Sequence, residues 1–582
     1  MRQINIVKIL LGIVGMVGML TSCYDDKGNY DYRDIPKLEI VSSSDRYFVA
    51  LNSEIKIEPE IIFPDGQEQM NLSYAWILEG QLISTERVLV WVADRYTEES
   101  GSNLLFEVKD EDNNLVFRTV FSLDVVEPYE MQGYFVLAKK DGKVLVHQIR
   151  EENSETDKKA FSTLQDIYRM ENGEELSGDA FKLSEMYALN KGTANGEIMR
   201  QMMFVAPQQS NVVETSSFKK AEYGLQEMFG GAYPVGFSGV ANVIFGEHLD
   251  LVIDKEGKLY PRYKESNEFF FHSGSLFYAR PMSFEEEELS GIQYVPGHIT
   301  AKYNLLYDSH KRRLLVIWDY YDYYASEGDI KYQLGKIEEV TSNTVDGLTW
   351  PADVPTVEEA FQKYDVVHIA STRSDFNDYG TVYYFAVLKD PKTGKLYHYE
   401  FALEKEYGKP VLNLTSDDGK TVAVIFKELT GDAAKVFGNP NSIIHTLPSS
   451  YLGYGANQCR VTLIAVGKNL YAYNREGYLP GEVMGKDDEG NDMIATAPNP
   501  ELKGTFDSEI GVMTGINGTL YWGELLGLVM KNGVFECYSL ANVQYPAWNK
   551  QAQLQWRTPD NVDLGDPLDI FFSYDQQGFD WK

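Results

Sequence analysis

Cysteine is scarce in this chain, and the residue groupings that mark common catalytic or metal sites are missing from it. The 582 residues include three cysteines and eight scattered histidines. So few cysteines cannot form the framework of a protein of this size, and we expect Cys459 and Cys537 to be two separate buried thiols rather than a pair. There is no P-loop, dinucleotide fingerprint, HExxH, GxSxG or CxxC motif, and no pair of histidines at metal-ligand spacing. The motifs therefore predict no catalytic residue, no metal site and no cofactor.

Positive charge is also in short supply. The chain has 53 Lys and Arg against 87 Asp and Glu, a formal net charge of −34. This balance excludes nucleic acid as a partner, because nucleic-acid binding needs a basic surface, and it opposes electrostatic docking onto anionic lipid. Aromatic residues, in contrast, reach 13% and include 39 tyrosines. Tyrosine at this level suits β-structure and also surfaces that contact ligands.

The N-terminal end carries one short hydrophobic run. Arg2 and Lys8 precede an apolar stretch over residues 9–20, and Leu-Thr-Ser-Cys follows, ending at Cys23. The run is short for a membrane-spanning helix, which needs about 20 apolar residues, so residues 1–22 are predicted to be a signal peptide; a short transmembrane anchor is the alternative. The Leu-small-small-Cys pattern resembles the bacterial lipobox. That resemblance implies acylation of Cys23, with chains such as palmitate anchoring the protein at ~0.8 kcal/mol per buried methylene.

The residues after Cys23 are acidic and polar. Asp25 and Asp26 resemble the surface-export signal of Bacteroides-type lipoproteins, which implies an outer-membrane protein that faces the cell exterior. An ordinary solvated linker is the alternative. Residues 23–35 show no apolar period and are predicted to form a tether.

Short strands are expected in residues 36–127. Apolar stretches of strand composition, separated by Asp, Asn and Gly turns, lie at 38–41, 55–57, 74–77, 88–91, 104–108 and 117–126. This spacing favours a β-sandwich with Trp76 in its core. The segment resembles the PKD-like family of Bacteroides surface lipoproteins, from the opening at residues 23–32 through residues 74–76 to the hairpin at 106–126. The resemblance covers about the first fifth of the chain.

One type of hairpin recurs through residues 128–582. Each copy is an apolar strand, a turn of Asp, Asn, Gly or Lys, and a second apolar strand, and the copies lie at 135–146, 251–260, 305–316, 385–397, 463–473 and 528–535, with a weaker one near 203–206. Such repetition predicts a β-propeller of about seven blades, with six or eight as variants and two successive sandwiches as the alternative. The whole chain is thus predicted to be all-β. Two inserts favour helices, one on the apolar face of residues 160–168 and one after a capping box of Thr356 and Glu359.

Two acidic motifs are weak candidates for a functional site. Residues 346–350 resemble the Asp-box turn of sialidase-type propellers, but the spacing departs by one residue and the motif occurs once. Asp487–Asp492 offers oxygen ligands for calcium, but it lacks the EF-hand spacing, so a solvated acidic loop is the favoured interpretation.

Aromatic residues in expected loops are the stronger functional lead. Rings stack on the C–H faces of sugars, and the same rings can hold a peptide; packing between blades is the competing explanation. The candidate ligand-binding residues are Tyr320, Tyr321, Tyr323, Tyr324, Trp350, Tyr451, Tyr454, Trp522 and Trp548.

The family resemblance implies a role beside a Sus-like outer-membrane transporter pair. The expected work is non-catalytic capture of an oligosaccharide or a peptide for uptake. A surface-displayed glycan hydrolase or lyase is one alternative, because a carboxylate pair across a cleft leaves no sequence signature. A structural subunit of the transporter complex is the other.

Overall fold

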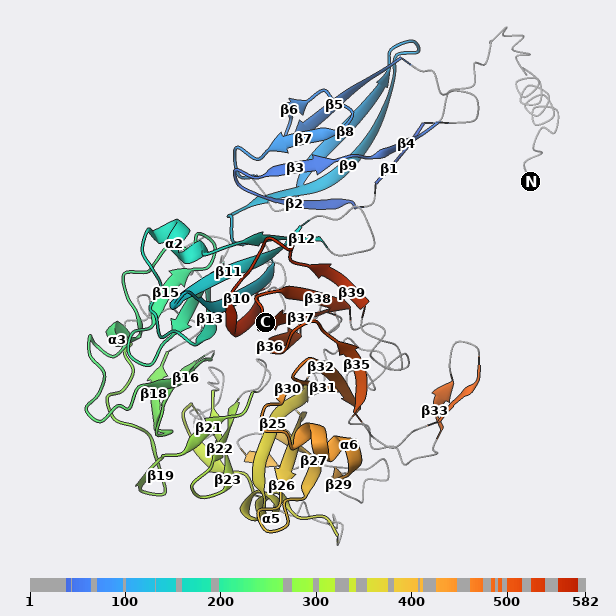
Figure 1. The fold of residues 1–582 in the computed structure, drawn as a ribbon. Coiled ribbons are helices and arrows are strands. Elements are labelled where there is room, and N and C mark those ends of the chain that lie inside the picture. Colours follow the sequence, from blue (N-terminus) through green and yellow to red (C-terminus); the bar gives the residue numbers. More distant parts are fainter. Residues whose placement is uncertain are drawn as a thin grey trace, which may run out of the picture.

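The computed structural model describes residues 38–573, except 43, 64–70, 98–100, 131, 153–159, 190–197, 247, 265–274, 297–302, 320–333, 342–352, 375–380, 407–408, 412–424, 447–460, 475–482, 487–489, 495–499, 516–524 and 540–552. Strands dominate this part of the chain and helices are short. The predicted all-β class is confirmed. Figure 1 shows a small group of sheets near the N-terminal end and a larger group formed by the rest of the chain. No helix within the described ranges is long and apolar enough to cross a membrane.

The N-terminal group consists of three sheets around one core. The strand order in the largest sheet is β2-β9-β8-β5-β6, and β3 pairs with β7 and β1 with β4. The strands are β1 (Glu39–Val41), β2 (Arg46–Ala50), β3 (Glu54–Ile57), β4 (Glu60–Ile62), β5 (Leu72–Leu78), β6 (Gln81–Ser84), β7 (Leu89–Val92), β8 (Ser102–Asp110) and β9 (Leu115–Val126).

Trp76 lies at the centre of this core, as the sequence predicted. Its side chain is fully buried and its ring stacks on Phe106, with ring centroids 4.2 Å apart. The indole Nε1 donates a hydrogen bond to the backbone carbonyl of Glu86 at 3.0 Å. A buried indole needs such a partner, because an unpaired N–H in an apolar core is costly. One hydrogen bond therefore fixes the orientation of the largest side chain in the N-terminal group.

The rest of the described chain forms a succession of antiparallel sheets, which Figure 1 shows from green to red. The first contains β10 (Gly133–Lys140), β11 (Lys143–Glu152), β12 (Ala160–Leu164) and β40 (Asp566–Ser573). The second contains β13 (Lys182–Leu189), β14 (Ile198–Val205) and β15 (Asn211–Glu214). The third contains β16 (Val240–Phe245), β17 (Leu249–Asp254) and β18 (Leu259–Tyr263). The fourth contains β21 (Ile292–Tyr294), β22 (Tyr303–Asp308), β23 (Arg313–Trp318) and β24 (Ile337–Glu339).

Three further sheets follow, and two short hairpins lie outside this series. The fifth contains β25 (Asp365–Ser374), β26 (Thr381–Lys389), β27 (Leu396–Glu406), β28 (Lys409–Val411) and β29 (Ile425–Leu429). The sixth contains β30 (Ile443–Thr446), β31 (Val461–Val466), β32 (Asn469–Asn474) and β35 (Glu501–Thr505). The seventh contains β36 (Ile510–Gly515), β37 (Leu525–Met530), β38 (Phe535–Ser539) and β39 (Gln553–Arg557). The hairpins are β19 (Ser283–Phe284) with β20 (Glu287–Glu288), and β33 (Val483–Lys486) with β34 (Asp492–Ile494).

The recurring hairpins of the sequence form a matching pair of strands in six of these sheets. They are β10-β11, β17-β18, β22-β23, β26-β27, β31-β32 and β37-β38, and the weaker copy near residue 203 falls in β14. In the first hairpin, Asp141 has φ 51° and Gly142 has φ 80°. Two successive positive φ values are what a tight two-residue turn between twisted strands requires. The predicted hairpins are therefore confirmed.

Neighbouring sheets are joined by buried apolar clusters. Met203 of the second sheet shares one cluster with Val252 of the third, and Leu463 of the sixth shares another with Leu528 of the seventh. Equivalent clusters join the first sheet to the second, the third to the fourth, the fourth to the fifth and the fifth to the sixth. A further cluster joins the seventh sheet to the first. The core of this part is thus divided among the gaps between successive sheets.

Cys537 lies in the cluster between the seventh and first sheets and is fully buried. Its Sγ lies 3.8 Å from the hydroxyl of Tyr134. The expectation of a buried thiol is confirmed for Cys537, while Cys459 lies outside the described residues.

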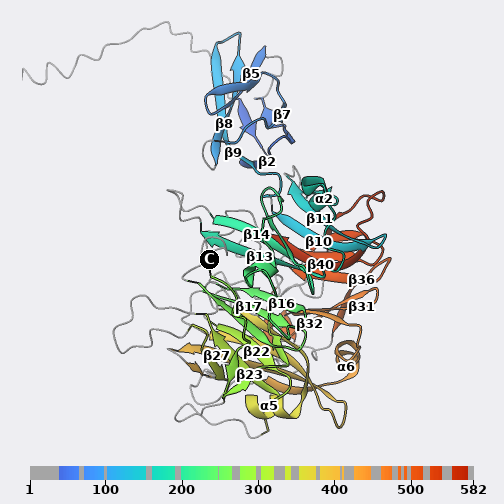
Figure 2. The ribbon, with the colours of Figure 1, turned by 90° about the vertical axis from the view of Figure 1, so that its left-hand side faces the viewer.

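Helices occur where one sheet passes to the next. They are α2 (Ile167–Asn172), α3 (Leu225–Met228), α5 (Val357–Lys363) and α6 (Gly431–Phe437), and Figure 2 shows α2 and α6 at the same side of the sheets. The capping box before α5 is confirmed, since Glu359 N donates to Thr356 Oγ1 at 3.3 Å and Thr356 N donates to Glu359 Oε2 at 3.0 Å.

The other predicted helix is partly wrong. Residues Ala160–Leu164 form β12, and only Ile167–Asn172 are helical. Pairing with β11, which places Phe161 opposite Glu151, supplies backbone hydrogen bonds that outweigh a weak local helical period.

Candidate functional site

The residues that the sequence named as site candidates lie in parts of the chain that the structure does not describe. These residues are Cys23, Tyr320, Tyr321, Tyr323, Tyr324, Trp350, Tyr451, Tyr454, Trp522 and Trp548. The same holds for the Asp-box-like turn at 346–350 and for residues 487–489 of the acidic loop. Across the described ranges, no group of three or more His, Cys, Asp and Glu side chains could hold a metal ion. The aromatic and calcium assignments stay predictions.

The residues on either side of the segment that contains Tyr320–Tyr324 are described, and their hydrogen bonds show where the chain leaves β23 and where it returns. Trp318 ends β23, is buried, and donates from Nε1 to Glu338 Oε2 at 3.0 Å. Its backbone N–H donates to Lys336 O at 3.0 Å, and Gly335 N donates to Trp318 O at 2.7 Å. Asp319 Oδ1 accepts the backbone N–H of His248 at 2.7 Å. The segment therefore leaves and returns at one fixed place, and that place borders the third sheet.

Tyr263 packs against the returning end of this segment. It is the last residue of β18, and a Cβ built on Gly335 would lie 2.5 Å from the ring and the hydroxyl oxygen of Tyr263. Gly335 also has a φ of +74°, a value that side chains other than glycine rarely adopt. Glycine is required here for two independent reasons, and the first shows that the Tyr263 ring lies close to the backbone just before β24.

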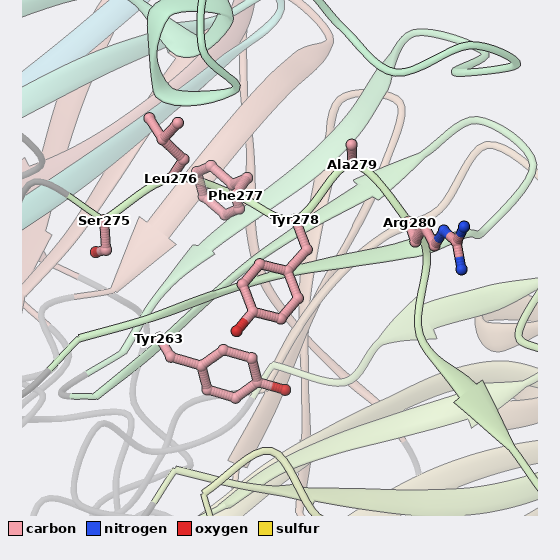
Figure 3. Close-up of a pocket in the computed structure, with 7 residues that line it drawn as sticks. All are labelled: Tyr263, Ser275, Leu276, Phe277, Tyr278, Ala279 and Arg280. Atoms are coloured by element: carbon pink, nitrogen blue, oxygen red, sulfur yellow. The ribbon is translucent and has the colours of Figure 1, made fainter.

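A surface cavity of about 630 Å³ opens beside Tyr263, as Figure 3 shows. Its lining residues are Tyr263, Ser275, Leu276, Phe277, Tyr278, Ala279 and Arg280. The rings of Tyr263 and Tyr278 lie 5.3 Å apart and are inclined at 57°. Tyr278 is 56% exposed and Leu276 is 42% exposed. This size is typical of small-molecule sites, and the lining offers two aromatic faces, apolar carbon and one cationic group.

The lining segment is held along β18 by main-chain hydrogen bonds. Tyr278 N donates to Pro261 O at 2.9 Å, and Met282 N donates to Leu259 O at 2.8 Å. Phe277 is buried and stacks on Phe229, with ring centroids 5.0 Å apart. Because neighbouring side chains of an extended segment point to opposite sides, burial of Phe277 directs Tyr278 outward into the cavity.

A buried ion cluster fixes the direction of Tyr263 in the same way. Asp250 is fully buried and stands opposite Arg262 in the β17–β18 register. Its Oδ2 accepts a hydrogen bond from Arg262 Nε at 2.8 Å, and its Oδ1 lies 2.8 Å from Lys264 Nζ. Arg262 and Lys264 flank Tyr263 and share one face of the strand, so Tyr263 takes the other face. The Arg262 guanidinium also lies 5.6 Å from the ring centre of Phe277, which links the cluster to the cavity wall.

Tyr263 keeps its hydroxyl proton at neutral pH. Burial raises the pKa of Tyr263, and the neighbouring Tyr278 raises it further. A neutral phenol can both donate and accept a hydrogen bond. The cavity can therefore pair with ligand hydroxyl or amide groups and also stack against their apolar faces.

Sequence reasoning missed Tyr263, Tyr278 and Arg280 because they do not form a dense aromatic run. Tyr278 follows Phe277 in a short apolar patch, and Tyr263 lies just beyond the predicted hairpin at 251–260. The available signal was the alternation around Tyr263: two basic residues, Arg262 and Lys264, flank one tyrosine in a strand whose partner strand carries Asp250.

Comparisons with known proteins define the class of the N-terminal part. The model of the PKD-like family matches residues 23–179, a little over a quarter of the chain. The match begins at Cys23 and extends through α2. The protein is thus an all-β chain with a PKD-like region. No curated protein matches the chain.

Solved structures with weak similarity include three that cover most of the chain. Yeast RCC1 bound to Kap60 is 12% identical and covers 76% of this chain and 89% of its own, with a TM-score of 0.32. An auxiliary nutrient binding protein from Bacteroides ovatus is 10% identical and covers 84% of this chain and 95% of its own, with a TM-score of 0.27. Human WBSCR16 is 9% identical and covers 76% of this chain and 99% of its own, with a TM-score of 0.31. Every one of these TM-scores is below 0.5.

Proposed function

We propose that this chain is a lipid-anchored outer-membrane protein that binds a ligand at the cell surface, as a non-catalytic accessory component of a Sus-like uptake system. The ligand is an oligosaccharide or a peptide. The observation that carries the proposal is the cavity lined by Tyr263 and Tyr278, whose rings lie 5.3 Å apart. Aromatic faces beside hydrogen-bonding groups suit sugar rings and peptide side chains alike.

The anchor rests on the N-terminal sequence. Residues 1–22 are the signal peptide, Cys23 receives the lipid, and residues 23–35 form the tether that follows it. The acidic residues Asp25 and Asp26 direct the protein to the outer face of the membrane. The PKD-like model match, which begins at residue 23, supports this division of the chain.

The binding part is a seven-bladed β-propeller over residues 128–582, carried on a sandwich over residues 36–127. Three features support the propeller: seven successive antiparallel sheets in the described residues, the apolar clusters between neighbours, and the pairing of β40 with β10. In such a fold the last strand completes the first blade, and no sheet keeps a long free edge. The sandwich and tether act as a stalk that places the propeller near a transporter.

The cavity lies beside one of the described ends of the segment that carries the predicted ligand-binding residues Tyr320–Tyr324. The segment with Tyr320–Tyr324 starts and ends at Asp319 and Gly335, and Gly335 packs on Tyr263. None of the described residues that line the cavity is Asp or Glu, whereas a glycosidase mechanism requires a pair of carboxyl groups. This composition favours binding over hydrolysis at this cavity.

Isothermal calorimetry of the full-length protein in detergent, against a panel of oligosaccharides and peptides, tests the proposal. We expect at least one oligosaccharide or peptide to bind, with weaker binding by the Tyr278→Ala variant. The absence of binding to every panel member would contradict the binding role. Release of labelled product from an oligosaccharide by the purified protein would instead support the enzyme alternative.

A further inference from the structure

Arg280 lies at the cavity and has no carboxylate partner among the residues that the structure describes. It is exposed and lines the cavity together with Tyr278 and Leu276. The ion pairs among the described residues engage other arginines, including Arg262 and Arg313, but none engages Arg280. The chain has 87 acidic residues and a net charge of −34, so acidic partners for a surface arginine are plentiful. An arginine that has no ion pair with the described residues and lines the same cavity as two tyrosines is available to an anionic ligand.

The chemistry of the other lining groups further restricts the class of ligand that fits the cavity. Tyr263 and Tyr278 offer inclined ring faces and hydroxyl groups, and Leu276 offers exposed apolar carbon. A pyranose ring has apolar C–H faces and hydroxyls around its rim, and it matches this combination of groups. The cavity volume of about 630 Å³ is also in the range that encloses a small ligand.

We propose that this cavity binds an anionic sugar residue of an oligosaccharide, with the pyranose ring against Tyr278 and Tyr263 and its acidic group on Arg280. The inference rests on the proposed binding function and specifies its ligand. A guanidinium presents parallel N–H donors that match the two oxygens of a carboxylate or a sulfate. At long range the negative charge of the protein repels such a ligand, but this repulsion is screened beyond about 8–10 Å at physiological salt. Contact with Arg280 then decides the affinity.

The test is a titration of the full-length protein in detergent with four ligands. The first is an oligogalacturonate and the second is the same oligosaccharide after reduction of its carboxyl groups. The third is a sulfated oligosaccharide, which distinguishes the two sources of negative charge. The fourth is an acidic peptide of similar charge, which separates sugar recognition from attraction of negative charge alone.

Variants separate the role of the charge from that of the rings. Arg280→Gln removes the positive charge. Arg280→Lys keeps the charge but lacks the planar guanidinium with its parallel N–H donors. Tyr278→Phe keeps the ring face, whereas Tyr278→Ala removes it. Arg87→Gln and Tyr96→Ala are matched controls, since both residues are exposed on the N-terminal sheets, far along the chain from the cavity.

We expect the acidic oligosaccharide to bind about tenfold or more tightly than its reduced form, because charge-assisted hydrogen bonds are the strong ones. Arg280→Gln should abolish this preference, Arg280→Lys should restore part of it, and added salt should weaken binding of the acidic form alone. Tyr278→Ala, which removes the ring, should weaken binding of both forms more than Tyr278→Phe, which removes the hydroxyl alone, and the two controls should bind as the wild type does. A preference for the sulfated sugar over the carboxylated one would identify sulfate as the anionic group.

Results of two kinds with the oligosaccharides would overturn the inference and leave the binding function intact. One is equal affinity for the acidic and reduced oligosaccharides, and the other is an acidic preference that survives in Arg280→Gln. Tighter binding of the acidic peptide than of every sugar would also overturn it, in favour of a peptide ligand. Absence of binding to all four ligands, with binding to another panel member, would contradict the ligand class; absence of binding to the whole panel would contradict the proposed function itself.

Discussion

Phe572, in the last strand of the described chain, stands opposite Tyr134, in the first strand after the N-terminal sheets, and their rings meet edge to face with centroids 4.9 Å apart. The two residues are more than 400 positions apart in the sequence, yet they belong to one sheet. The first sheet is therefore complete only when the C-terminal strand has been added. Folding of the larger part of the protein depends on this long-range pairing.

Phe572→Ala should destabilise the larger part of the protein by about 3–5 kcal/mol, the usual cost of removing a buried phenylalanine. Phe572 is 6% exposed and packs in the cluster that joins the seventh sheet to the first. Denaturant unfolding followed by tyrosine fluorescence measures the effect. Val120→Ala is the control, because Val120 is 54% exposed on the N-terminal sheets; equal shifts for both variants would contradict a structural role for the closing strand.

Asp250→Asn should lower the free energy of unfolding more than the loss of a surface ion pair does. The substitution leaves Arg262 and Lys264 buried without their counter-charge, which costs about 3–5 kcal/mol when one partner of a buried pair is removed. Glu107→Gln breaks the exposed pair with Arg118 and should cost about 0–1 kcal/mol. Thermal unfolding of both variants provides the comparison. Similar melting temperatures would show that the cluster does not hold the strand that carries Tyr263.

Gly335→Ala tests the contact between the fourth sheet and Tyr263. Gly394→Ala is a matched control, because Gly394 has a φ of +71° with nothing within 4 Å of its added Cβ, whereas Gly335 has a φ of +74° and meets the Tyr263 ring. Both variants should lose about 1–2 kcal/mol from the left-handed backbone conformation. Gly335→Ala should lose more and should also weaken ligand binding, since it must displace Tyr263. Calorimetric titration of both variants checks this, and equal affinity would contradict the contact.

Acidification should destabilise the protein through His147. The side chain is buried, its Nε2 lies 3.0 Å from Leu564 O, and its Nδ1 accepts the backbone N–H of Asp166 at 3.3 Å. Burial lowers the pKa of His147 to about 4. Below pH 6.5 the unfolded chain takes up a proton that the folded chain does not, so stability should fall from about pH 6.5 down to about pH 4.

A shift of this size corresponds to about 3 kcal/mol at the acidic end of that range. His147→Gln removes the titrating group, so its loss of unfolding free energy between pH 7.5 and pH 4.5 should be smaller than that of the wild type. Denaturant unfolding at the two pH values makes the comparison. An equal pH dependence in both proteins would exclude His147 as a cause.

The hairpins and the N-terminal core were accessible from sequence because their signals are local. Asp141 and Gly142 form a turn signal between two apolar stretches, and the structure places them at positive φ. Trp76 lies in a short apolar stretch of strand composition, and the structure buries it in the core of the N-terminal group. Such patterns need only a few residues to be recognised.

The features of the fold and of the cavity that the sequence did not predict depend on contacts between segments that are far apart in the chain. Residues 160–164 have a helical period, but they pair with β11 as a strand. The cavity combines Tyr263 with Tyr278 across an intervening segment, and Gly335 reaches Tyr263 from another sheet. Neither the distance between the two rings nor the absence of an ion pair between Arg280 and the described residues can be deduced from the order of the residues. The anchor at Cys23 and the loop aromatics lie outside the described residues and remain predictions.

The ratio of ligand affinities between the wild type and Tyr278→Ala tests the account most directly. The ligand is the tightest binder found in the oligosaccharide and peptide panel, and the melting temperature of each protein is measured alongside. Tyr278 is 56% exposed, so its removal should leave stability unchanged while it weakens binding about tenfold or more, as loss of an aromatic stacking partner does. Unchanged affinity in a variant that folds normally would show that the Tyr263–Tyr278 cavity is not the binding site.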